Sequence, residues 1–307
     1  MRPNESLISV VIPVFNGSAH VAGAAASVIG QEGVDVECVV VDDGSTDATA
    51  AVAAAVDPAI RVISTPNRGV ASARNLGAAA TSGELIAFLD ADDRWEPDRL
   101  AVCAQALEDD PGADAVLCAM RFVAPSGERL GRLGARVPPT PKAMLLREVT
   151  FPPASSCILV RRETFDRIGG FEPCLSSAAD WDLTLRIAET GRLICLDQDL
   201  VEYIVRDNSM SHDIGLLARD ARRSYELAFS RHPRDRGFRR RARSVMCRML
   251  CGALFESSRD PRALGYAALS IALHPGSAPA TVRASLARLR GHVNPESRWT
   301  LNTGTPT

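Results

Sequence analysis

Three aspartates fall within four positions directly after an apolar run. Asp90, Asp92 and Asp93 follow ELIAFL in the stretch FLDADDRW. Carboxylates this close repel one another, and burying them without a partner is costly. In an extended segment Asp90 and Asp92 share one face, where a hard divalent cation with oxygen ligands would relieve the repulsion. This spacing predicts a cation site, and the alternative is a solvated cluster of capping acids.

Three other polar segments follow apolar runs in the same part of the chain. They are Pro13-Val14-Phe15-Asn16, Asp42-Asp43-Gly44-Ser45 and Asn67-Arg68-Gly69. A carboxylate in the second segment can accept a hydrogen bond from a nucleobase N–H, while an Asx turn before a helix is the alternative, above all for Asp42. Four polar strand ends together are stronger evidence for a ligand site than any one of them.

Alternating strands and helices would bring these four segments together. Apolar, β-branched runs predict strands at 7–15, within 36–47, at 59–65 and at 84–90, and small-residue helices are expected at 20–31, 47–56 and within 67–82. This alternation predicts a parallel α/β sheet with right-handed crossovers. In such sheets ligands bind beyond the carboxyl ends of the strands, where all four polar segments would lie.

After residue 97 the sequence predicts further strands and helices, and then helices alone. Further elements are expected as a helix at 98–109, a strand at 114–123, a loop at 124–141, a strand with a short helix and turn at 152–171, a helix at 178–191 and one or two strands at 193–206. Beyond about His212 the spacing becomes helical throughout. We therefore expect an α-helical C-terminal appendage.

Five motifs of the sequence resemble, in their order along the chain, those of the inverting glycosyltransferases of family 2. They are SVVIPVFNG, VVVDDGSTD, NRGVASARNLG, GELIAFLDADD and ADWDLTLRIA. The resemblance spans residues 7 to about 212 and implies an α/β GT-A fold, a Rossmann-like nucleotide-diphospho-sugar transferase domain with a mostly parallel sheet. The expected organisation is a GT-A domain at 1–212, with a nucleotide-binding half at 1–95 and an acceptor half at 96–212, a helical region at 213–293 and a disordered tail at 294–307.

The resemblance also implies roles for individual residues. The donor nucleotide would contact Pro13, Val14, Phe15, Asn16, Asp43, Arg74 and Asp90, and a divalent cation, Mn²⁺ or Mg²⁺, would bind Asp92 and Asp90. His212 is a further candidate, near the metal or the diphosphate. Asp180 would be the general base that deprotonates the acceptor hydroxyl. The alternatives are a surface arginine for Arg74, a helix N-cap for Asp180 and polar surface for His212. Asp93 would lie behind the cation ligands or cap a helix.

The expected reaction moves a single sugar from a UDP-, GDP- or dTDP-sugar to a glycan or lipid-linked acceptor, as in cell-envelope or extracellular polysaccharide synthesis. Processive relatives carry Gln-x-x-Arg-Trp, whereas here no Gln stands at that spacing before Arg298 and Trp299. A GT-A-like nucleotidyltransferase and a non-catalytic nucleotide- or sugar-binding scaffold are the alternatives. The stretch NGSAHVAG lacks the basic glycine-rich loop that the nucleotidyltransferase would need, and no G-x-G-x-x-G follows the first strand.

The composition of the chain limits its possible cellular location and binding partners. The 307 residues carry a net charge of -2 and eight Cys without a C-x-x-C pair, which favours buried free thiols in a reducing compartment. No signal peptide or apolar run long enough to span a bilayer is recognisable, so we expect a cytoplasmic protein, peripheral at the inner face of the membrane. The eight arginines within Arg231–Arg248 are either a patch for anionic lipid or, as we favour, a solvated helix face. Nucleic acid is not an expected partner.

Overall fold

The computed structural model describes residues 4–149, 151–152, 154–206, 213–231, 235–258, 262–279 and 282. The chain forms two compact units, one of residues 1–139 and 151–206 and the other of residues 140–150 and 207–307. The second unit thus includes residues 140–150, which the sequence had placed in the acceptor half. In this unit the Tyr225 hydroxyl donates to the Leu145 carbonyl oxygen at 2.8 Å, which fixes the segment against a helix.

The first unit is built on a nine-stranded sheet, in the order β3-β2-β1-β4-β8-β6-β9-β5 with β7 beside β6. The strands β3, β2, β1 and β4 are parallel, and the far half of the sheet is mixed. The bounds are β1 (Asn4–Val14), β2 (Val34–Asp42), β3 (Ile60–Ser64), β4 (Leu85–Phe88), β5 (Arg94–Trp95), β6 (Ala115–Val123), β7 (Arg129–Leu133), β8 (Ile158–Arg161) and β9 (Leu193–Ile204).

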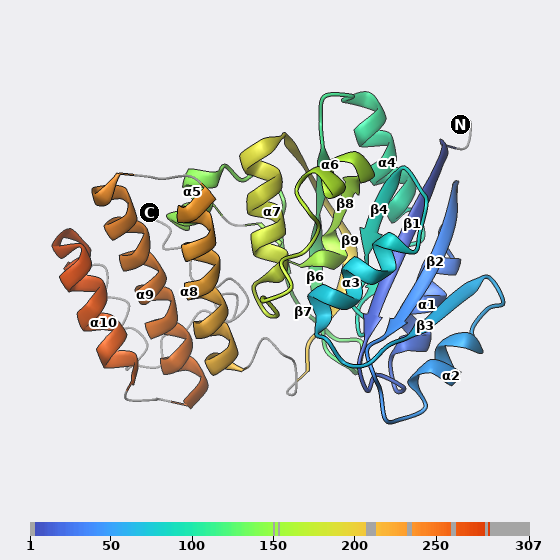
Figure 1. Cartoon of the computed structure of the whole chain (residues 1–307), viewed down its shortest axis with the longest axis horizontal. Helices are drawn as coiled ribbons and strands as arrows, with labels where there is room; N and C mark the ends of the chain where they lie inside the picture. The colour runs from blue at the N-terminus through green and yellow to red at the C-terminus, as the bar shows by residue number, and fades with distance from the viewer. Residues whose placement is uncertain are drawn as a thin grey trace. The chain divides into compact units, whose positions relative to one another are not determined.

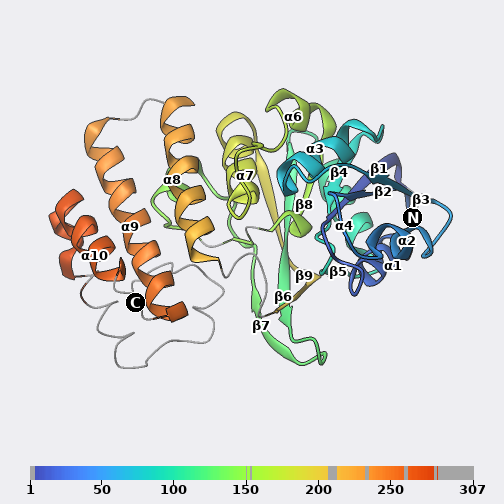
Figure 2. The ribbon, with the colours of Figure 1, turned by 60° about the horizontal axis from the view of Figure 1, so that its bottom comes forward.

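Helices cover both faces of this sheet. Figures 1 and 2 show α3 (Val70–Ala79) and α6 (Arg162–Arg167) on one face, and α1 (Val21–Ile29) and α4 (Arg99–Asp109) on the other. The unit also contains α2 (Thr49–Ala54) and α7 (Ala179–Thr190). Because the central strands are covered on both sides, their side chains are apolar at nearly every position, as in the fully buried residues of β1. The predicted α/β fold is confirmed.

The prediction of a loop over 124–141 was wrong, because β7 lies within it and pairs antiparallel with β6. The strand is held by charge as well as by its backbone: Arg132 Nε lies 2.7 Å and Arg129 Nη2 lies 2.9 Å from the Asp199 carboxylate of β9. The sequence RLGRL lacks the alternation of apolar and polar residues that identifies a strand, so β7 could not be predicted from hydrophobic periodicity.

Close packing of α3 on β1 depends on Gly77. A methyl group there would overlap the side chain of Val11 and press on that of Val41. We therefore expect Gly77→Ala to lower the free energy of unfolding by about 1–3 kcal/mol, measured by denaturant titration. In the control Gly23→Ala, on α1, the new methyl would meet only the movable end of the exposed Arg94 side chain. The control should be neutral or slightly stabilising, and equal losses in both variants would contradict the argument.

The second unit is helical, as the sequence predicted for the C-terminal region. It contains α5 (Pro141–Leu145), α8 (Ile214–Arg231), α9 (Arg236–Ser258), α10 (Arg262–Leu273) and η3 (Pro275–Ser277). The Ser244 hydroxyl joins α9 to α10 by donating to the Ser270 carbonyl oxygen at 2.8 Å. Among the described helices of both units, none is long and apolar enough to cross a membrane. The predicted tail at 294–307 lies outside the described residues.

Candidate active site

The polar segments after β1 and β2 lie side by side because Val14 pairs with Asp42 at the carboxyl ends of these parallel strands. The Asn16 carboxamide oxygen accepts from the Thr46 backbone N–H at 2.8 Å, and the Asn16 N–H donates to Ser45 Oγ at 2.8 Å. Pro13 and Val14 are buried below this turn, whereas the Phe15 side chain is 52% exposed. Phe15 thus offers an aromatic face at the strand edge.

Asp43 is buried and holds the loop that leads into α3. Its two carboxylate oxygens accept from the backbone N–H groups of Arg68 and Gly69, each at 2.8 Å. Gly69 has φ of +88°, a conformation that other residues rarely adopt, and it directly precedes the helix. Asp42 accepts from the Ser45 N–H at 2.9 Å, the local turn considered for it from the sequence. Because each carboxylate oxygen has a second lone pair, Asp43 keeps the capacity to accept from a ligand.

Arg74 joins two acids from distant parts of the chain. Its side chain is only 3% exposed, with Nη2 at 2.6 Å from Asp90 Oδ1 and Nη1 at 2.7 Å from Asp180 Oδ1. The guanidinium also lies 4.9 Å from the centre of the Phe171 ring. The alternative of a surface arginine is therefore wrong. Arg74 brings together α3, the segment after β4 and the start of α7.

Asp180 lies in the first turn of α7, after the N-cap residue Ala178, and does not cap the helix. Burial raises the pKa of Asp180 to about 6, although the neighbouring Arg74 guanidinium and a hydrogen bond from the Ser155 backbone N–H lower it. A carboxylate with a pKa close to the working pH is well suited to accept a proton. By contrast, Asp182 is fully buried and pairs with Arg186 at 2.7 Å, a structural role.

The three acids of the DADD segment have different surroundings. Asp90 accepts from the Ser155 hydroxyl at 3.1 Å in addition to Arg74. Asp93 is buried and accepts from the Ser156 hydroxyl at 2.6 Å, while α4 begins later with Asp98 as its N-cap, so the interpretation of Asp93 as a helix cap was wrong. Burial and repulsion by Asp90 raise the pKa of Asp92, and Arg206 opposes them.

This charge pattern fits a divalent cation beside Asp92. Burial and repulsion by Asp90 and Asp92 raise the pKa of Asp93 as well, so the cluster holds more negative charge than its surroundings neutralise. Asp92 is half-buried and therefore partly accessible. The described residues contain no group of three or more His, Cys, Asp or Glu side chains that would hold a metal by itself. His212 lies outside the described residues.

A cavity of about 620 Å³ opens beside these acids, a size that suits a small ligand. Besides Asp92 and Asp93 it is lined by residues around the start of α1, in the β6–β7 turn and around the end of β9, among them His20, Glu202 and Arg206. Burial and the nearby Arg206 lower the pKa of His20. Sequence reasoning missed His20 and Arg206, since each is a single polar residue at the end of an element.

The short helix η1 (Ser155–Cys157) supplies the serines that contact Asp90 and Asp93. The fully buried Arg99 fixes it by donating to the Ser156 and Ile158 carbonyl oxygens at 3.1 and 2.8 Å. The Trp95 indole N–H also donates to the Ser156 carbonyl oxygen, at 2.9 Å. These positioning contacts were not predicted, because serines carry no signal that distinguishes them in the sequence.

The arginines predicted within Arg231–Arg248 lie mostly on α9, apart from position 234, which is outside the described residues. Arg236, Arg240, Arg241 and Arg243 are exposed. This arrangement is compatible with the solvated helix face that the sequence favoured.

Comparison with known proteins identifies sequence relatives that cover most of the chain. The family model described as Glycosyl transferase family 2 matches residues 9–169. Succinoglycan biosynthesis protein ExoO of Rhizobium meliloti strain 1021 is 33% identical over 304 residues, covering 86% of this chain and 85% of that protein. Hyaluronan synthase of Pasteurella multocida is 28% identical over 214 residues, covering 68% of this chain but only 22% of the synthase.

Solved structures share the fold. A fragment of S. aureus TarS in complex with UDP-GlcNAc superposes with a TM-score of 0.64 at 17% identity, covering 93% of this chain and 89% of the fragment. Mannosyltransferase PcManGT from Pyrobaculum calidifontis, in complex with GDP-Man and Mn²⁺, superposes with a TM-score of 0.60 at 21% identity, covering 97% of this chain and 84% of that one.

Proposed function

Because the chain belongs to glycosyltransferase family 2 and is a glycosyltransferase, we propose that it moves a single sugar from a nucleoside diphosphate donor to a hydroxyl of a glycan or lipid-linked acceptor, with inversion at the anomeric carbon. One observation carries the proposal: Arg74 contacts the proposed cation ligand Asp90 through one terminal nitrogen of its guanidinium and the proposed base Asp180 through the other. In the proposed reaction a proton acceptor would therefore lie next to the acids that face the donor diphosphate.

The strand edge would hold the donor nucleoside. Phe15 offers a ring on which a base can stack, Asn16 shapes the turn, and Asp43 has lone pairs for a base N–H. The diphosphate would lie toward Asp90 and Asp92. Carboxylates bind Mg²⁺ or Mn²⁺ together with substrate phosphates in many enzymes, and such an ion stabilises charge that develops on the leaving group.

Asp180 would remove the proton from the acceptor hydroxyl. As the acceptor oxygen forms its bond to the anomeric carbon, the bond to the diphosphate oxygen breaks with its electron pair on that oxygen, and the hydroxyl proton passes to the Asp180 carboxylate. Arg74 favours the ionised form of Asp180 and so opposes the effect of burial. It also fixes the orientation of the carboxylate that must meet the acceptor.

The relatives support the substrate classes in this proposal. UDP-GlcNAc and GDP-Man are bound to the TarS and PcManGT structures, and the second of these also holds Mn²⁺. The names of ExoO and hyaluronan synthase connect sequence relatives to polysaccharide synthesis. We therefore propose a metal-dependent role in cell-envelope or extracellular polysaccharide synthesis. The expected cytoplasmic location remains a prediction.

A calorimetric panel of UDP, GDP, dTDP and CDP, each with Mn²⁺ and with EDTA, would test the donor site. We expect one nucleotide to bind tightly in the presence of the ion and to lose affinity by about thirtyfold or more in Asp92→Asn, since a charged partner of the bound complex is removed. Asp98→Asn is the matched control, because Asp98 is an exposed acid six positions after Asp92 in the sequence. No binding of any of the four nucleotides by folded wild-type protein would contradict the proposed nucleoside diphosphate donor site.

A further inference from the structure

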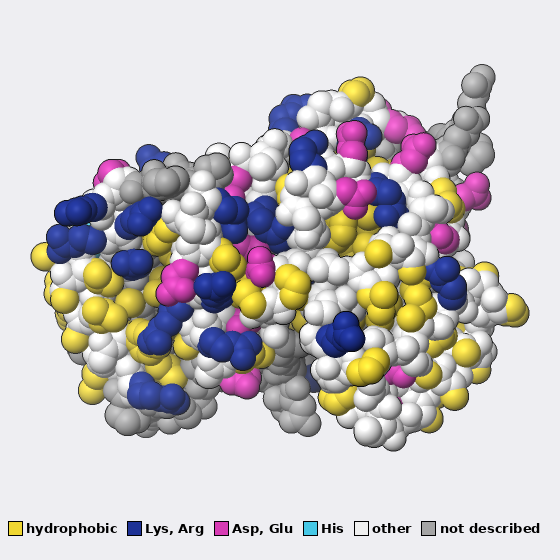
Figure 3. Space-filling view, in the orientation of Figure 1, with side chains coloured by type: hydrophobic (Ala, Val, Ile, Leu, Met, Phe, Trp, Pro, Cys, Tyr) yellow, Lys and Arg dark blue, Asp and Glu magenta, His cyan; other side chains and the backbone are white. Residues whose placement is uncertain are grey.

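The two parts of the sequence differ sharply in charge. Residues 1–212 contain 18 basic and 30 acidic side chains, which gives a formal charge of -12. Residues 213–293 contain 16 basic and 6 acidic side chains, which gives a formal charge of +10. The net charge of the whole chain conceals this contrast. Figure 3 shows the Lys and Arg side chains gathered over the surface of α8, α9 and α10. The helical unit therefore attracts anions that the transferase unit repels.

This unit contains an arginine-lined cavity of about 580 Å³. Its walls come from α8, the end of α9 and the start of α10, and its lining residues are Gly215, Ala218, Arg219, Arg222, Arg223, Glu226, Leu254, Arg262 and Tyr266. Positions 219, 222, 223 and 226 lie on one face of α8, because residues three and four apart are neighbours on a helix. Four of the nine lining residues are arginine, against one acid.

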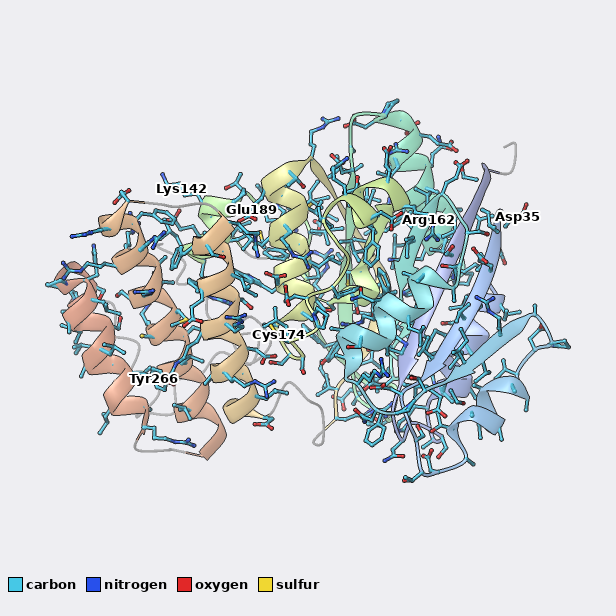
Figure 4. All side chains as sticks on the ribbon, viewed as in Figure 1. Asp35, Lys142, Arg162, Cys174, Glu189 and Tyr266 are labelled. Carbon is cyan, nitrogen blue, oxygen red and sulfur yellow. The ribbon has the colours of Figure 1, made fainter. Side chains whose placement is uncertain are left out.

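Two of these arginines are held in place by contacts at the wall of the cavity. Arg222 Nη2 donates to the Tyr266 hydroxyl at 2.7 Å, and its guanidinium lies 5.5 Å from the centre of that ring. Figure 4 labels Tyr266 on α10. Arg219 Nη2 lies 2.9 Å from the buried carboxylate of Asp220, while the Arg219 side chain remains 62% exposed. Each guanidinium has five N–H donors, so both keep donors for a ligand.

We propose that this cavity, which we call the arginine cavity, binds a phosphate or diphosphate group. Phosphate oxygens match the planar fork of arginine, and several guanidinium groups around one anion give short charge-assisted hydrogen bonds. Leu254 and Tyr266 contribute apolar surface to the lining of the cavity. The group is carried either by a lipid or by a soluble molecule, and both present the same oxygens. The proposal does not rest on the transfer reaction.

The test uses the full chain and two double variants that remove equal charge. Arg222→Gln with Arg262→Gln changes the arginine cavity, and Arg236→Gln with Arg240→Gln changes exposed arginines on α9 outside it. One arm titrates inorganic pyrophosphate in EDTA by calorimetry. The other measures sedimentation with phosphatidylcholine vesicles containing phosphatidic acid, against vesicles with phosphatidylglycerol. Circular dichroism checks folding, and Arg262→Gln alone leaves the contact between Arg222 and Tyr266 intact.

We expect the cavity variant to lose affinity by about tenfold or more in at least one arm, and the α9 variant by less than about threefold. Pyrophosphate binding alone would assign a soluble ligand, and a preference for phosphatidic acid vesicles alone would assign a lipid-borne phosphate. Equal losses in the two variants would show a general attraction by net charge and overturn the proposal. Absence of wild-type binding in both arms would overturn it as well.

Discussion

Replacing Asp180 by Asn is expected to lower kcat about one hundred- to ten thousand-fold while leaving donor binding nearly unchanged, because the amide keeps the shape of the side chain but cannot accept the acceptor proton. Release of the nucleoside diphosphate would count turnovers, and the calorimetric panel would report binding. Asp98→Asn is the control for the loss of one carboxylate charge at an exposed position and should retain wild-type turnover. Turnover close to wild type in Asp180→Asn would show that another group is the base.

The pH dependence of kcat/KM would identify the same residue independently. Only ionised Asp180 can act as a base, and its pKa is about 6, so activity should fall tenfold per pH unit below about pH 6 and level off above it. In Asp180→Asn the small residual activity should lack this break. A break that persists in the variant would belong to another acid, of which Asp92, whose pKa is also raised, is the first candidate.

The strand edge of the site could be predicted because it depends on local sequence. Continuous apolar runs define β1, β2 and β4, and the carboxyl ends of parallel strands meet at one edge. Asn16, Asp42 and Asp43 therefore lie where the alternation of strands and helices predicted, with Val14 paired to Asp42. Their proposed roles toward the donor remain predictions.

The contacts that join distant segments could not be predicted in this way. Arg74 and Asp180 are 106 positions apart, and their pairing follows from how closely α3 packs on β1, which Gly77 permits. Ser156, which donates to Asp93, is held by the buried Arg99. The sequence around a serine or a helical arginine does not indicate which distant residue it contacts. These contacts are therefore visible only in the folded chain.

Replacing Arg74 by Met is expected to lower the free energy of unfolding by about 3–5 kcal/mol at neutral pH and to abolish measurable transfer. The side chain is 3% exposed, so its loss leaves Asp90 and Asp180 facing each other without their shared cation. Arg74→Lys is the matched variant: it keeps the charge but cannot bridge both acids with one planar group, and it should be intermediate in both properties. Denaturant titration and nucleotide release are the measurements.

The sign of the pH effect distinguishes lost charge pairing from lost packing. Without Arg74 the pKa of Asp180 in the folded protein should rise further above the value near 4 of the unfolded chain, so the folded state gives up this proton less readily. The loss of stability relative to wild type should therefore grow as pH rises above about 6, the pKa of Asp180 in the wild-type folded protein, and shrink below it, where Asp180 is protonated in both folded proteins. The double variant Arg74→Met with Asp180→Asn should regain part of the lost stability yet remain inactive, because one uncompensated charge has gone together with the base. The opposite result is a loss in free energy of unfolding that is independent of pH and unchanged by the second substitution. That result would mean that Arg74 stabilises the fold by packing alone.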